Sequence, residues 1–465
     1  MSIPPAALRV AIIGSGPAGF YAAEALQKAA AGIRIDLYDR LPTPFGLVRG
    51  GVAPDHPKIK SVARVFERIA SQPGFRFLGN VQVGQDITPA ELKRHYDAVI
   101  YAFGADTDRH LGIPGEHLAG SHPATELVAW YNGHPDYADC TFDLSQRAAA
   151  VVGIGNVAMD TVRIMATSPD HLATTDLALH ALDALRNANL QELHIIARRG
   201  PVQAACTTPE LRELGEIDGV DVIVDPQDLE LDAASAAFLA DDANRTEQNN
   251  LALFRGWAER GSTGAPRRIV FHFGVSPVEL IGAHHVTGVR LVRNRLLPDG
   301  HGSVQAIATD EELTIPIGLV FRSVGYRGTE LPGLPFDARR GLIPNVTGRV
   351  VESTDSATAI HGVYVAGWIK RGPHGVIGTN KSCAAETVDH LLADAVSGRL
   401  PPAEGTAADL DALLAERGVE VTSWADWQAI DRAEVERGKA AGRPREKLVD
   451  VAEMLAVVRA GRGER

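Results

Sequence analysis

The sequence predicts an α/β fold that contains two Rossmann-like dinucleotide-binding domains. Two segments have the order strand, glycine-rich turn and helix, beginning at Leu8 and at Ala148. The 465 residues suffice for two large domains. No C-x-x-C pair occurs among Cys140, Cys206 and Cys383, which excludes a disulfide framework, a cysteine-ligated iron–sulfur cluster and a redox dithiol.

The first unit carries a complete dinucleotide fingerprint. The apolar run Leu8–Ile13 predicts a buried strand, and Phe20–Ala30 predicts the helix that follows it. The pattern G-x-G-x-x-G between them permits a tight turn, the approach of a pyrophosphate and close packing of helix on strand. Its glycines are Gly14, Gly16 and Gly19.

The second unit repeats this pattern with alanine in the third place. Ala148–Val152 predicts the strand and Met159–Ala166 the helix. Alanine is an accepted variant at the last position of the fingerprint. The three fingerprint residues are Gly153, Gly155 and Ala158.

The next strand of each unit ends in different residues. Ile33–Tyr38 ends at Asp39, whose carboxylate suits the hydroxyls of an unphosphorylated ribose. Leu193–Ala197 ends at Arg198 and Arg199. Two guanidinium groups would bind a 2′-phosphate by charge-assisted hydrogen bonds, so the second site should prefer NADPH. A solvated basic strand end is the alternative.

Further elements follow from periodicity and turn signals. Residues 227–268 are polar and helical in character, and the last sixty residues have helical spacing. Trp424 and Trp427 would share a helix face as packing anchors. Further helices are expected at Leu177–Asn187 and Lys381–Leu392, further strands at Ile269–Phe273, Val289–Val292, Leu319–Val324 and Gly362–Ala366, and a turn at Pro298–Gly300.

Charge and cysteine content limit the partners and the compartment. The net charge of −12 argues against binding to nucleic acid or an anionic membrane. No apolar run is long enough to span a bilayer. Met1–Pro5 lacks the features of a signal peptide, and sparse cysteine fits a reducing compartment. We therefore expect a cytoplasmic protein without membrane insertion.

Several segments resemble the adrenodoxin reductase-type ferredoxin–NADP(+) reductases. The longest is PTPFGLVRGGVAPDHP at 42–57, and the resemblance runs nearly end to end. Asp39 stands where the family has Glu, Ile154 where a polar residue is common, and His374 where Thr is usual. The other segments are GNVAMD at 155–160, RRGP at 198–201, ELREL at 210–214, IPNV at 343–346, GWIKRGP at 367–373, GVI at 375–377 and GRPREKL at 442–448.

The resemblance implies a glutathione-reductase-like layout and a reaction. An FAD-binding domain would comprise residues 1–106 and 331–465, with an NADP-binding domain, 107–330, inserted. NADPH would give a hydride to FAD, and single electrons would pass to an acidic iron–sulfur ferredoxin. Whether that ferredoxin supplies a cytochrome P450 stays open. FAD contacts would be Ala18, Asp39, Leu47, Val83, Arg109, Trp368, Gly375, Val376 and Ile377; NADP contacts would be Ile154, Gly155, Asn156, Val157, Arg198, Arg199, Glu210 and Gly375.

Three residues are candidates for a role near the reacting rings. The resemblance places His56 beside the flavin, with Glu213 and Asp160 as partners. A His–Glu pair there would fix the nicotinamide carboxamide or relay a proton. Hydride transfer itself needs mainly proximity and orientation, and a lone histidine is more often structural, so the alternatives stay open.

Two further features concern the flavin and the partner. The start of the helix after Gly375 would stabilise negative charge on the flavin. Trp368 would lie along the flavin or the nicotinamide face, or it is a core residue. A basic surface would steer an acidic ferredoxin, although each charge is equally a solvated one. The candidates are Arg212, Arg267, Arg268, Lys370, Arg371 and Lys381.

Two other functions remain possible at this stage. A flavin monooxygenase also carries two dinucleotide fingerprints, but no segment suggests an organic-substrate pocket. A non-catalytic dinucleotide-binding protein would have no need for the arginines at the second site. The sequence therefore favours an NADPH:ferredoxin oxidoreductase.

Overall fold

The computed structural model describes residues 8–241, 243–299, 304–356 and 358–463. The chain divides into two compact units. Unit 1 comprises residues 1–107 and 326–465, and unit 2 comprises residues 108–325. Met1–Pro5 and Gly300 of the predicted turn lie outside the described residues.

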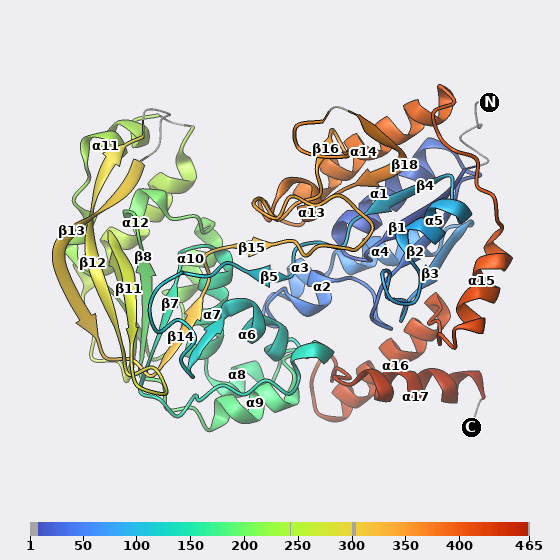
Figure 1. Cartoon of the computed structure of the whole chain (residues 1–465). Coiled ribbons are helices and arrows are strands. Elements are labelled where there is room, and N and C mark those ends of the chain that lie inside the picture. The colour runs from blue at the N-terminus through green and yellow to red at the C-terminus, as the bar shows by residue number, and fades with distance from the viewer. Residues whose placement is uncertain (1–7, 242, 300–303, 357, 464–465) are drawn as a thin grey trace. The chain divides into compact units, whose positions relative to one another are not determined.

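Unit 1 is built around a seven-stranded sheet in the order β16-β17-β18-β4-β1-β2-β3 (Figure 1). The strands from β18 to β3 run parallel, and β16 and β17 are antiparallel additions. β1 lies centrally, with Ile12 opposite Leu37 on one side and Ile100 on the other. The bounds are β1 Arg9–Ile13, β2 Arg34–Tyr38, β3 Phe75–Leu78, β4 Ala98–Tyr101, β16 Asn345–Val346, β17 Arg349–Val351 and β18 Ala359–Val365.

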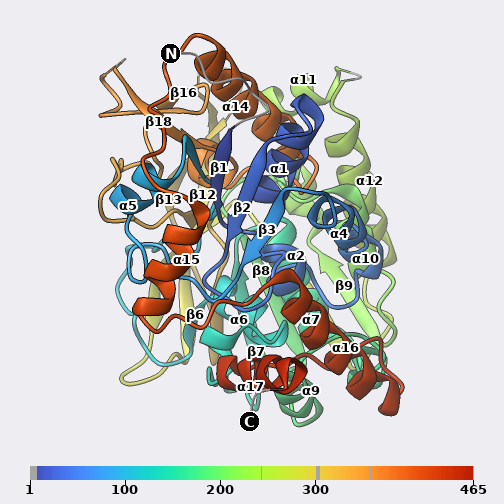
Figure 2. The ribbon, with the colours of Figure 1, turned by 90° about the vertical axis from the view of Figure 1, so that its right-hand side faces the viewer.

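Apolar side chains cover both faces of this sheet. One cluster joins α1, α4, α14, α16 and α17 to the sheet, and a second joins α5 and α15 to the other face. α16 and α17 lie side by side (Figures 1 and 2). The helices are α1 Pro17–Ala29, α2 Leu47–Gly50, α3 Pro57–Lys60, α4 Ala63–Ala70, α5 Pro89–His95, α13 Trp368–Arg371, α14 Thr379–Val396, α15 Ala407–Glu416, α16 Trp424–Ala440 and α17 Val451–Arg462.

Unit 2 contains a parallel six-stranded sheet, in the order β6-β14-β7-β8-β10-β9, and an antiparallel three-stranded sheet, β11-β12-β13. Apolar residues of β7, β8 and β14 pack against the three-stranded sheet. The strands are β6 Ser121–Pro123, β7 Ala148–Val152, β8 Glu192–Ala197, β9 Val220–Val224, β10 Arg267–Phe273, β11 Val275–Ile281, β12 Gly288–Pro298, β13 Val304–Ile315 and β14 Leu319–Arg322.

The remaining elements of unit 2 are helical, and two short strands, β5 Thr107–Asp108 and β15 Tyr326–Arg327, pair where the chain passes between the units. The helices are α6 Ala124–Tyr131, η2 Pro135–Tyr137, α7 Asn156–Ala166, α8 Pro169–Leu172, α9 Leu179–Arg186, η3 Pro201–Gln203, α10 Thr208–Leu214, η4 Pro226–Leu229, α11 Ala233–Leu239 and α12 Arg245–Arg260.

The predicted fold class is confirmed, while several element bounds differ from prediction. Helix α1 starts three residues earlier than expected because Pro17, with its φ already fixed near the helical value, takes the first helical position. α7 and α14 also start earlier, and α14 ends later, at Val396. β12 runs on to Pro298, well beyond the predicted Val292. None of the described helices is both long and apolar enough to cross a membrane.

Candidate functional site

The glycine turn of unit 1 has the geometry that its sequence predicts. Gly14 adopts φ +107°, and a β-carbon there would lie 2.6 Å from the carbonyl oxygen of Ala102. A β-carbon on Gly19 would lie 2.0 Å from the carbonyl oxygen of Gly14. Side chains at these two positions would therefore collide with the backbone, so α1 can approach β1 only with glycines in both places.

The space beside Gly16 is open. A β-carbon on Gly16 would meet no atom within 4 Å, and φ of −76° is compatible with any residue. Gly16 is also the N-cap of the thirteen-residue α1, and no side chain caps the helix. Uncapped N–H groups beside free space suit the pyrophosphate of FAD.

Asp39 lies directly after β2 and is held from two sides. One carboxylate oxygen accepts hydrogen bonds from the backbone N–H and the hydroxyl of Ser15, at 3.1 and 2.5 Å, and the other accepts from the N–H of Leu41 at 3.0 Å. Burial raises the pKa of Asp39 above its usual range, although these bonds act in the opposite direction. The carboxylate is thus pre-positioned at the fingerprint, as a ribose ligand requires.

The segment after Asp39 contacts the glycine turn in a strained conformation. Phe45 has φ +86°, which is an outlier for a bulky residue. Its N–H donates to the carbonyl of Ser15 at 3.0 Å, and a β-carbon on Gly46 would lie 2.9 Å from the Cα of Gly16. The Phe45 ring packs on Trp424 and Trp427, with centroids 6.1 and 5.6 Å away.

A buried carboxylate fixes the same segment to the C-terminal helices. Glu434 of α16 is fully buried and accepts from both terminal nitrogens of Arg49, from Arg445 and from the N–H of Leu448. The Arg49 guanidinium also lies over the Trp427 ring at 5.4 Å. Trp424 and Trp427 are confirmed as packing residues of the unit 1 core.

Trp368 is the first residue of α13, and its indole N–H is an unsatisfied hydrogen-bond donor. Its ring lies 5.5 Å from that of Tyr326, and its indole nitrogen is buried with no hydrogen-bond partner among the described residues. The preceding Gly367 abuts α1, since a β-carbon there would lie 2.6 Å from that of Ala18. A buried orphan donor beside the fingerprint helix is consistent with an absent acceptor such as FAD.

The loop before α14 accepts hydrogen bonds from more of the N–H groups at the start of this helix than predicted. Gly375 has φ +84°, and Val376 is 58% exposed. The N–H groups of residues 379, 380 and 381 donate to the carbonyls of residues 376, 377 and 378. The helix start therefore offers fewer free N–H groups to a flavin than the sequence predicts.

The remaining predicted FAD contacts lie in different places. Ala18 is buried in α1, Leu47 is 42% exposed in α2, and Val83 is half-buried against the second core cluster of unit 1. Arg109 belongs to unit 2, where its N–H donates to the carbonyl of Gly325 at 3.0 Å.

The glycine turn of unit 2 repeats that of unit 1. Gly153 has φ +130°, and a β-carbon there would lie 2.1 Å from the carbonyl oxygen of Ser323, whereas one on Gly155 would meet nothing within 4 Å. Gly155 caps α7 without a side-chain bond. Asn156 accepts from the N–H of Thr207 at 2.8 Å. Its neighbours Ile154 and Val157 are half-buried.

Arg198 and Arg199 follow the last residue of β8 directly. Arg198 is exposed and Arg199 half-buried. Among the described residues, no carboxylate pairs with either guanidinium. Burial and the neighbouring charge of Arg198 lower the pKa of Arg199 below its usual range. Two adjacent uncompensated cations beside an open glycine turn suit a dianionic 2′-phosphate.

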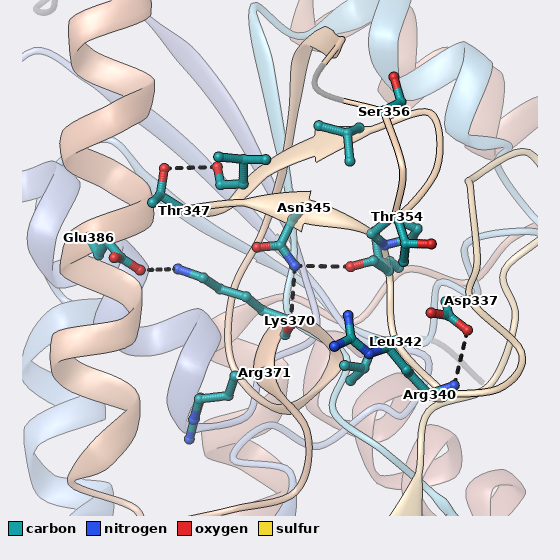
Figure 3. A pocket seen from close by; sticks show the side chains of 14 residues that line it. Asp337, Arg340, Leu342, Asn345, Thr347, Thr354, Ser356, Lys370, Arg371 and Glu386 are labelled. Carbon is teal, nitrogen blue, oxygen red and sulfur yellow. Dashed lines mark hydrogen bonds and ion pairs between the residues drawn. The ribbon is translucent and has the colours of Figure 1, made fainter.

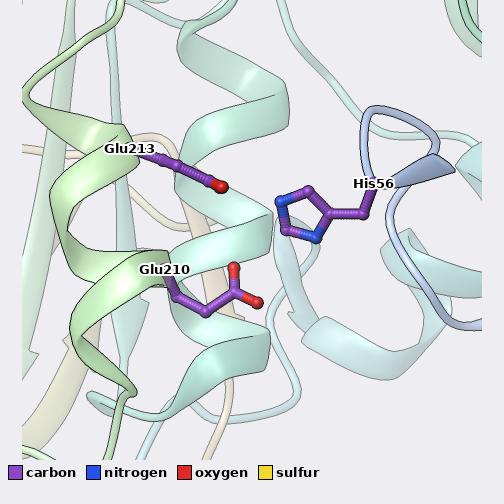
Figure 4. A group of neighbouring side chains, drawn as sticks. All are labelled: His56, Glu210 and Glu213. Carbon is purple, nitrogen blue, oxygen red and sulfur yellow. The ribbon is translucent and has the colours of Figure 1, made fainter. Parts of the chain in front are cut away.

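Glu210, Glu213 and Asp160 converge on one cation that the sequence analysis did not single out. Arg163 of α7 is 3% exposed. Its guanidinium lies 2.7 Å from Asp160, 3.2 Å from Glu210 and 3.3 Å from Glu213. Figure 4 shows the two glutamates extending from neighbouring turns of α10. The i, i+3 spacing of Asp160 and Arg163 on a helix was the available sequence signal.

His56 belongs to unit 1, where it precedes α3. It is half-buried, and its side chain makes no capping hydrogen bond to that helix. Figure 4 shows the imidazole ring of His56 extending from the loop before α3.

The predicted basic docking residues differ in how far their charge is already compensated. Lys370 lines a cavity of about 350 Å³ (Figure 3), with its ammonium 2.5 Å from Glu386 and 3.1 Å from the hydroxyl of Thr387. Arg268 lies 2.9 Å from Glu192, and Lys381 lies 3.8 Å from Glu24.

The other candidates carry less compensated charge. Arg371 donates to the carbonyl of His374 and to Asn380. Within the described ranges, Arg212 and Arg267 have no acidic side chain at ion-pair distance, and Arg212 is exposed. Arg212 is therefore the candidate best placed to meet an acidic partner.

The three cysteines are unpaired. Cys206 is 2% exposed, and burial raises the pKa of its thiol to about 12. Cys206 is therefore a small, buried and uncharged residue at neutral pH.

Comparison with known proteins gives consistent matches. A family model described as pyridine nucleotide-disulphide oxidoreductase matches residues 8–187. The NADPH-ferredoxin reductase FprA of Mycobacterium tuberculosis is 48% identical over 96% of this chain and 98% of its own length. A mitochondrial NADPH:adrenodoxin oxidoreductase of Arabidopsis thaliana is 41% identical, over 97% and 95%. The structure of M. tuberculosis FprA in complex with NADPH superposes with a TM-score of 0.90 and 47% identity, covering 97% of this chain and 99% of that one.

Proposed function

The chain belongs to the adrenodoxin reductase-type family of NADPH–ferredoxin reductases, and from this premise we propose which of its residues hold the cofactors. It is a flavoprotein oxidoreductase that uses FAD and NADPH and reduces a ferredoxin-type iron–sulfur protein. We assign FAD to unit 1, at the turn from Gly14 to Gly19, and NADPH to unit 2, at the turn from Gly153 to Ala158.

Bound FAD supplies the chemistry that joins the two substrates, because it accepts a hydride and releases electrons singly. The chain's own residues bind and orient. Uncapped N–H groups at the starts of α1 and α7 bind the pyrophosphates. Asp39 accepts from ribose hydroxyls, and the Trp368 indole donates to an acceptor on the flavin side of the site.

The preference for NADPH rests on one observation, the pair of uncompensated guanidinium groups at the end of β8. Arg198 and Arg199 bind the 2′-phosphate, which NADH lacks. A carboxylate at this place, as Asp39 provides in unit 1, would repel the phosphate.

A double substitution tests this assignment. In Arg198→Ala/Arg199→Ala, KM for NADPH should rise at least about 100-fold, since charged hydrogen bonds contribute about 1.5–3 kcal/mol each and two are lost. KM for NADH and the FAD content should change little. An equal rise in both KM values would contradict the phosphate assignment.

For His56, Glu213 and Asp160 we propose orienting roles at the nicotinamide. Arg163 holds both acidic residues in place within unit 2. His56→Ala should slow flavin reduction while FAD stays bound. Unchanged rates in a rapid-mixing experiment would leave His56 with a structural role only.

The finer partner assignment is an acidic ferredoxin that supplies a cytochrome P450 in the cytoplasm. Support comes from the exposed charge of Arg212 and from three cysteines without disulfides. NADPH-driven ferredoxin reduction that falls steeply with added salt would support the docking proposal. A salt-independent rate would contradict it.

A further inference from the structure

Asn294 of β12 holds the backbone of the arginine pair. Its side-chain nitrogen donates to the carbonyl oxygen of Arg198 at 2.8 Å and to the hydroxyl of Ser276 at 2.8 Å. A backbone carbonyl only accepts hydrogen bonds, so the amide nitrogen of Asn294 must face it. The two N–H bonds of this amide are thereby both used.

Two backbone bonds extend this contact to Arg199. The N–H of Gly274 donates to the carbonyl oxygen of Arg199 at 3.0 Å, and the N–H of Asn294 donates to the carbonyl oxygen of Gly274 at 2.6 Å. Gly274 has φ +62°, a conformation that favours glycine. The carbonyl of Arg198 is thus anchored to Asn294 of the three-stranded sheet, and that of Arg199 to Gly274, which is itself bonded to Asn294.

The strand is irregular at this point. The pairing of β12 with β13 shifts register between Val292 and Asn294. Such irregularities re-aim a side chain. Here the half-buried Asn294 is directed at the turn that follows β8, 96 positions earlier in the chain.

Anchoring matters because the two guanidinium groups repel each other. Without a ligand, the neighbouring positive charges favour backbone and side-chain arrangements that separate them. A turn whose carbonyls are fixed keeps both groups on the site and lowers the ordering cost when a phosphate binds.

We propose that Asn294 is a specificity-determining positioning residue, through which the three-stranded sheet of unit 2 fixes Arg198 and Arg199 for a 2′-phosphate. The inference rests on the proposed function of these arginines. Asn294 itself touches neither the phosphate nor the reacting atoms.

Binding of 2′,5′-ADP to the FAD-loaded enzyme, measured by titration calorimetry, tests the proposal without turnover. Asn294→Ala should weaken this binding about three- to tenfold, which is the range for one hydrogen bond. KM for NADPH should rise by a similar factor, whereas KM for NADH, kcat with NADH and FAD content should stay near wild type.

Ser276→Ala is the matched control. It removes the other partner of the same amide but leaves the bond from Asn294 to Arg198, so discrimination should persist. Asn294→Ser, a smaller change whose hydroxyl is too short to reach the carbonyl, should reproduce Asn294→Ala and serves if the alanine variant is unstable.

Unchanged 2′,5′-ADP affinity in both Asn294 variants would overturn the proposal, and so would equal losses for NADPH and NADH. The Arg198→Ala/Arg199→Ala variant separates this failure from that of the proposed function. If the arginine variant loses discrimination and the Asn294 variants do not, only the positioning role is wrong. If the arginine variant keeps discrimination, the phosphate assignment itself is wrong.

Discussion

The two units carry nearly the same glycine turn, but the next strand of each unit ends in different residues. In both, the first glycine has a positive φ and leaves no room for a side chain, and the second faces open space. Beyond the next strand, unit 1 has one carboxylate held by Ser15 and Leu41, and unit 2 has two uncompensated guanidinium groups. Under the proposed assignment, the turn specifies a dinucleotide, and the strand end specifies which one.

The two units also differ in their buried charges. In unit 1 the fully buried Glu434 is shared by Arg49 and Arg445, and Arg445 also lies 2.7 Å from Asp431. In unit 2 the arrangement is reversed, because the buried Arg163 is one cation shared by three carboxylates. The first cluster holds the segment that contacts the turn from Gly14 to Gly19, and the second holds the candidate acids Asp160, Glu210 and Glu213.

The largest expected effect tests whether the turns are specific for different cofactors. Gly16→Val should abolish FAD binding, because its side chain fills the space of the pyrophosphate without a backbone clash. The matched Gly155→Val should keep full flavin absorbance and lose NADPH binding. Retention of FAD by Gly16→Val, judged from flavin absorbance after gel filtration, would break the comparison.

The next effect concerns the buried cation of unit 2. Arg163→Met leaves three carboxylates without their common partner, and we expect a loss of about 3–5 kcal/mol in the free energy of unfolding. Urea denaturation of the FAD-loaded protein measures it. Arg186→Met, which breaks the exposed pair with Asp183, is the control and should cost less than about 1 kcal/mol. Equal costs would show that burial does not distinguish the two pairs.

A smaller effect, dependent on pH, is expected at the buried acid of unit 1. Burial tends to raise the pKa of Glu434, but Arg49, Arg445 and the N–H of Leu448 outweigh it and hold the pKa below the usual 4.5. An acid whose pKa is lower in the folded state stabilises the fold when the pH is above its unfolded-state pKa. This contribution is lost as the pH falls through the folded-state pKa.

Glu434→Gln should therefore cost about 2–3 kcal/mol at neutral pH and flatten the fall in stability below about pH 4.5. The melting temperature measured from neutral to acidic pH gives both quantities. An unaltered pH profile in the variant would contradict the assignment.

The smallest effect is expected at Asp39. Burial raises the pKa of this carboxyl, which means that its charged form costs free energy in the folded protein. A neutral amide in its place retains one acceptor oxygen. Asp39→Asn should weaken FAD binding by about 1 kcal/mol, measured by FAD dissociation under dilution. Complete loss of FAD would show that the charge, and not the acceptor, is what unit 1 requires.

Local features of the chain were predictable from sequence, and distant pairings were not. The fingerprint residues of each turn lie within five positions of one another, so the turns at Gly14 and Gly153 followed from the pattern. The distant backbone that crowds these two glycines, at Ala102 and Ser323, did not. The partners of Glu434 include Arg49, 385 positions away, and Arg163 meets Glu210 across 47 positions. No periodicity encodes such pairs, because tertiary packing alone brings them together.

The sequence also could not predict which basic surface residues are paired with an acidic side chain. Lys370 and Arg212 look alike as candidate docking residues, yet Lys370 is neutralised by Glu386 sixteen positions later and Arg212 is exposed. The start of α14 illustrates the same limit, since its N–H groups are satisfied by the loop that precedes it.

The packing of Phe45 on Trp424 and Trp427, reinforced by Arg49 and Glu434, sets an order for biosynthesis. The loop beside the first glycine turn leaves the ribosome early, but the residues that hold it in place are translated nearly four hundred codons later. A nascent chain in which α16 has not yet folded therefore lacks the contacts that hold this loop beside the turn.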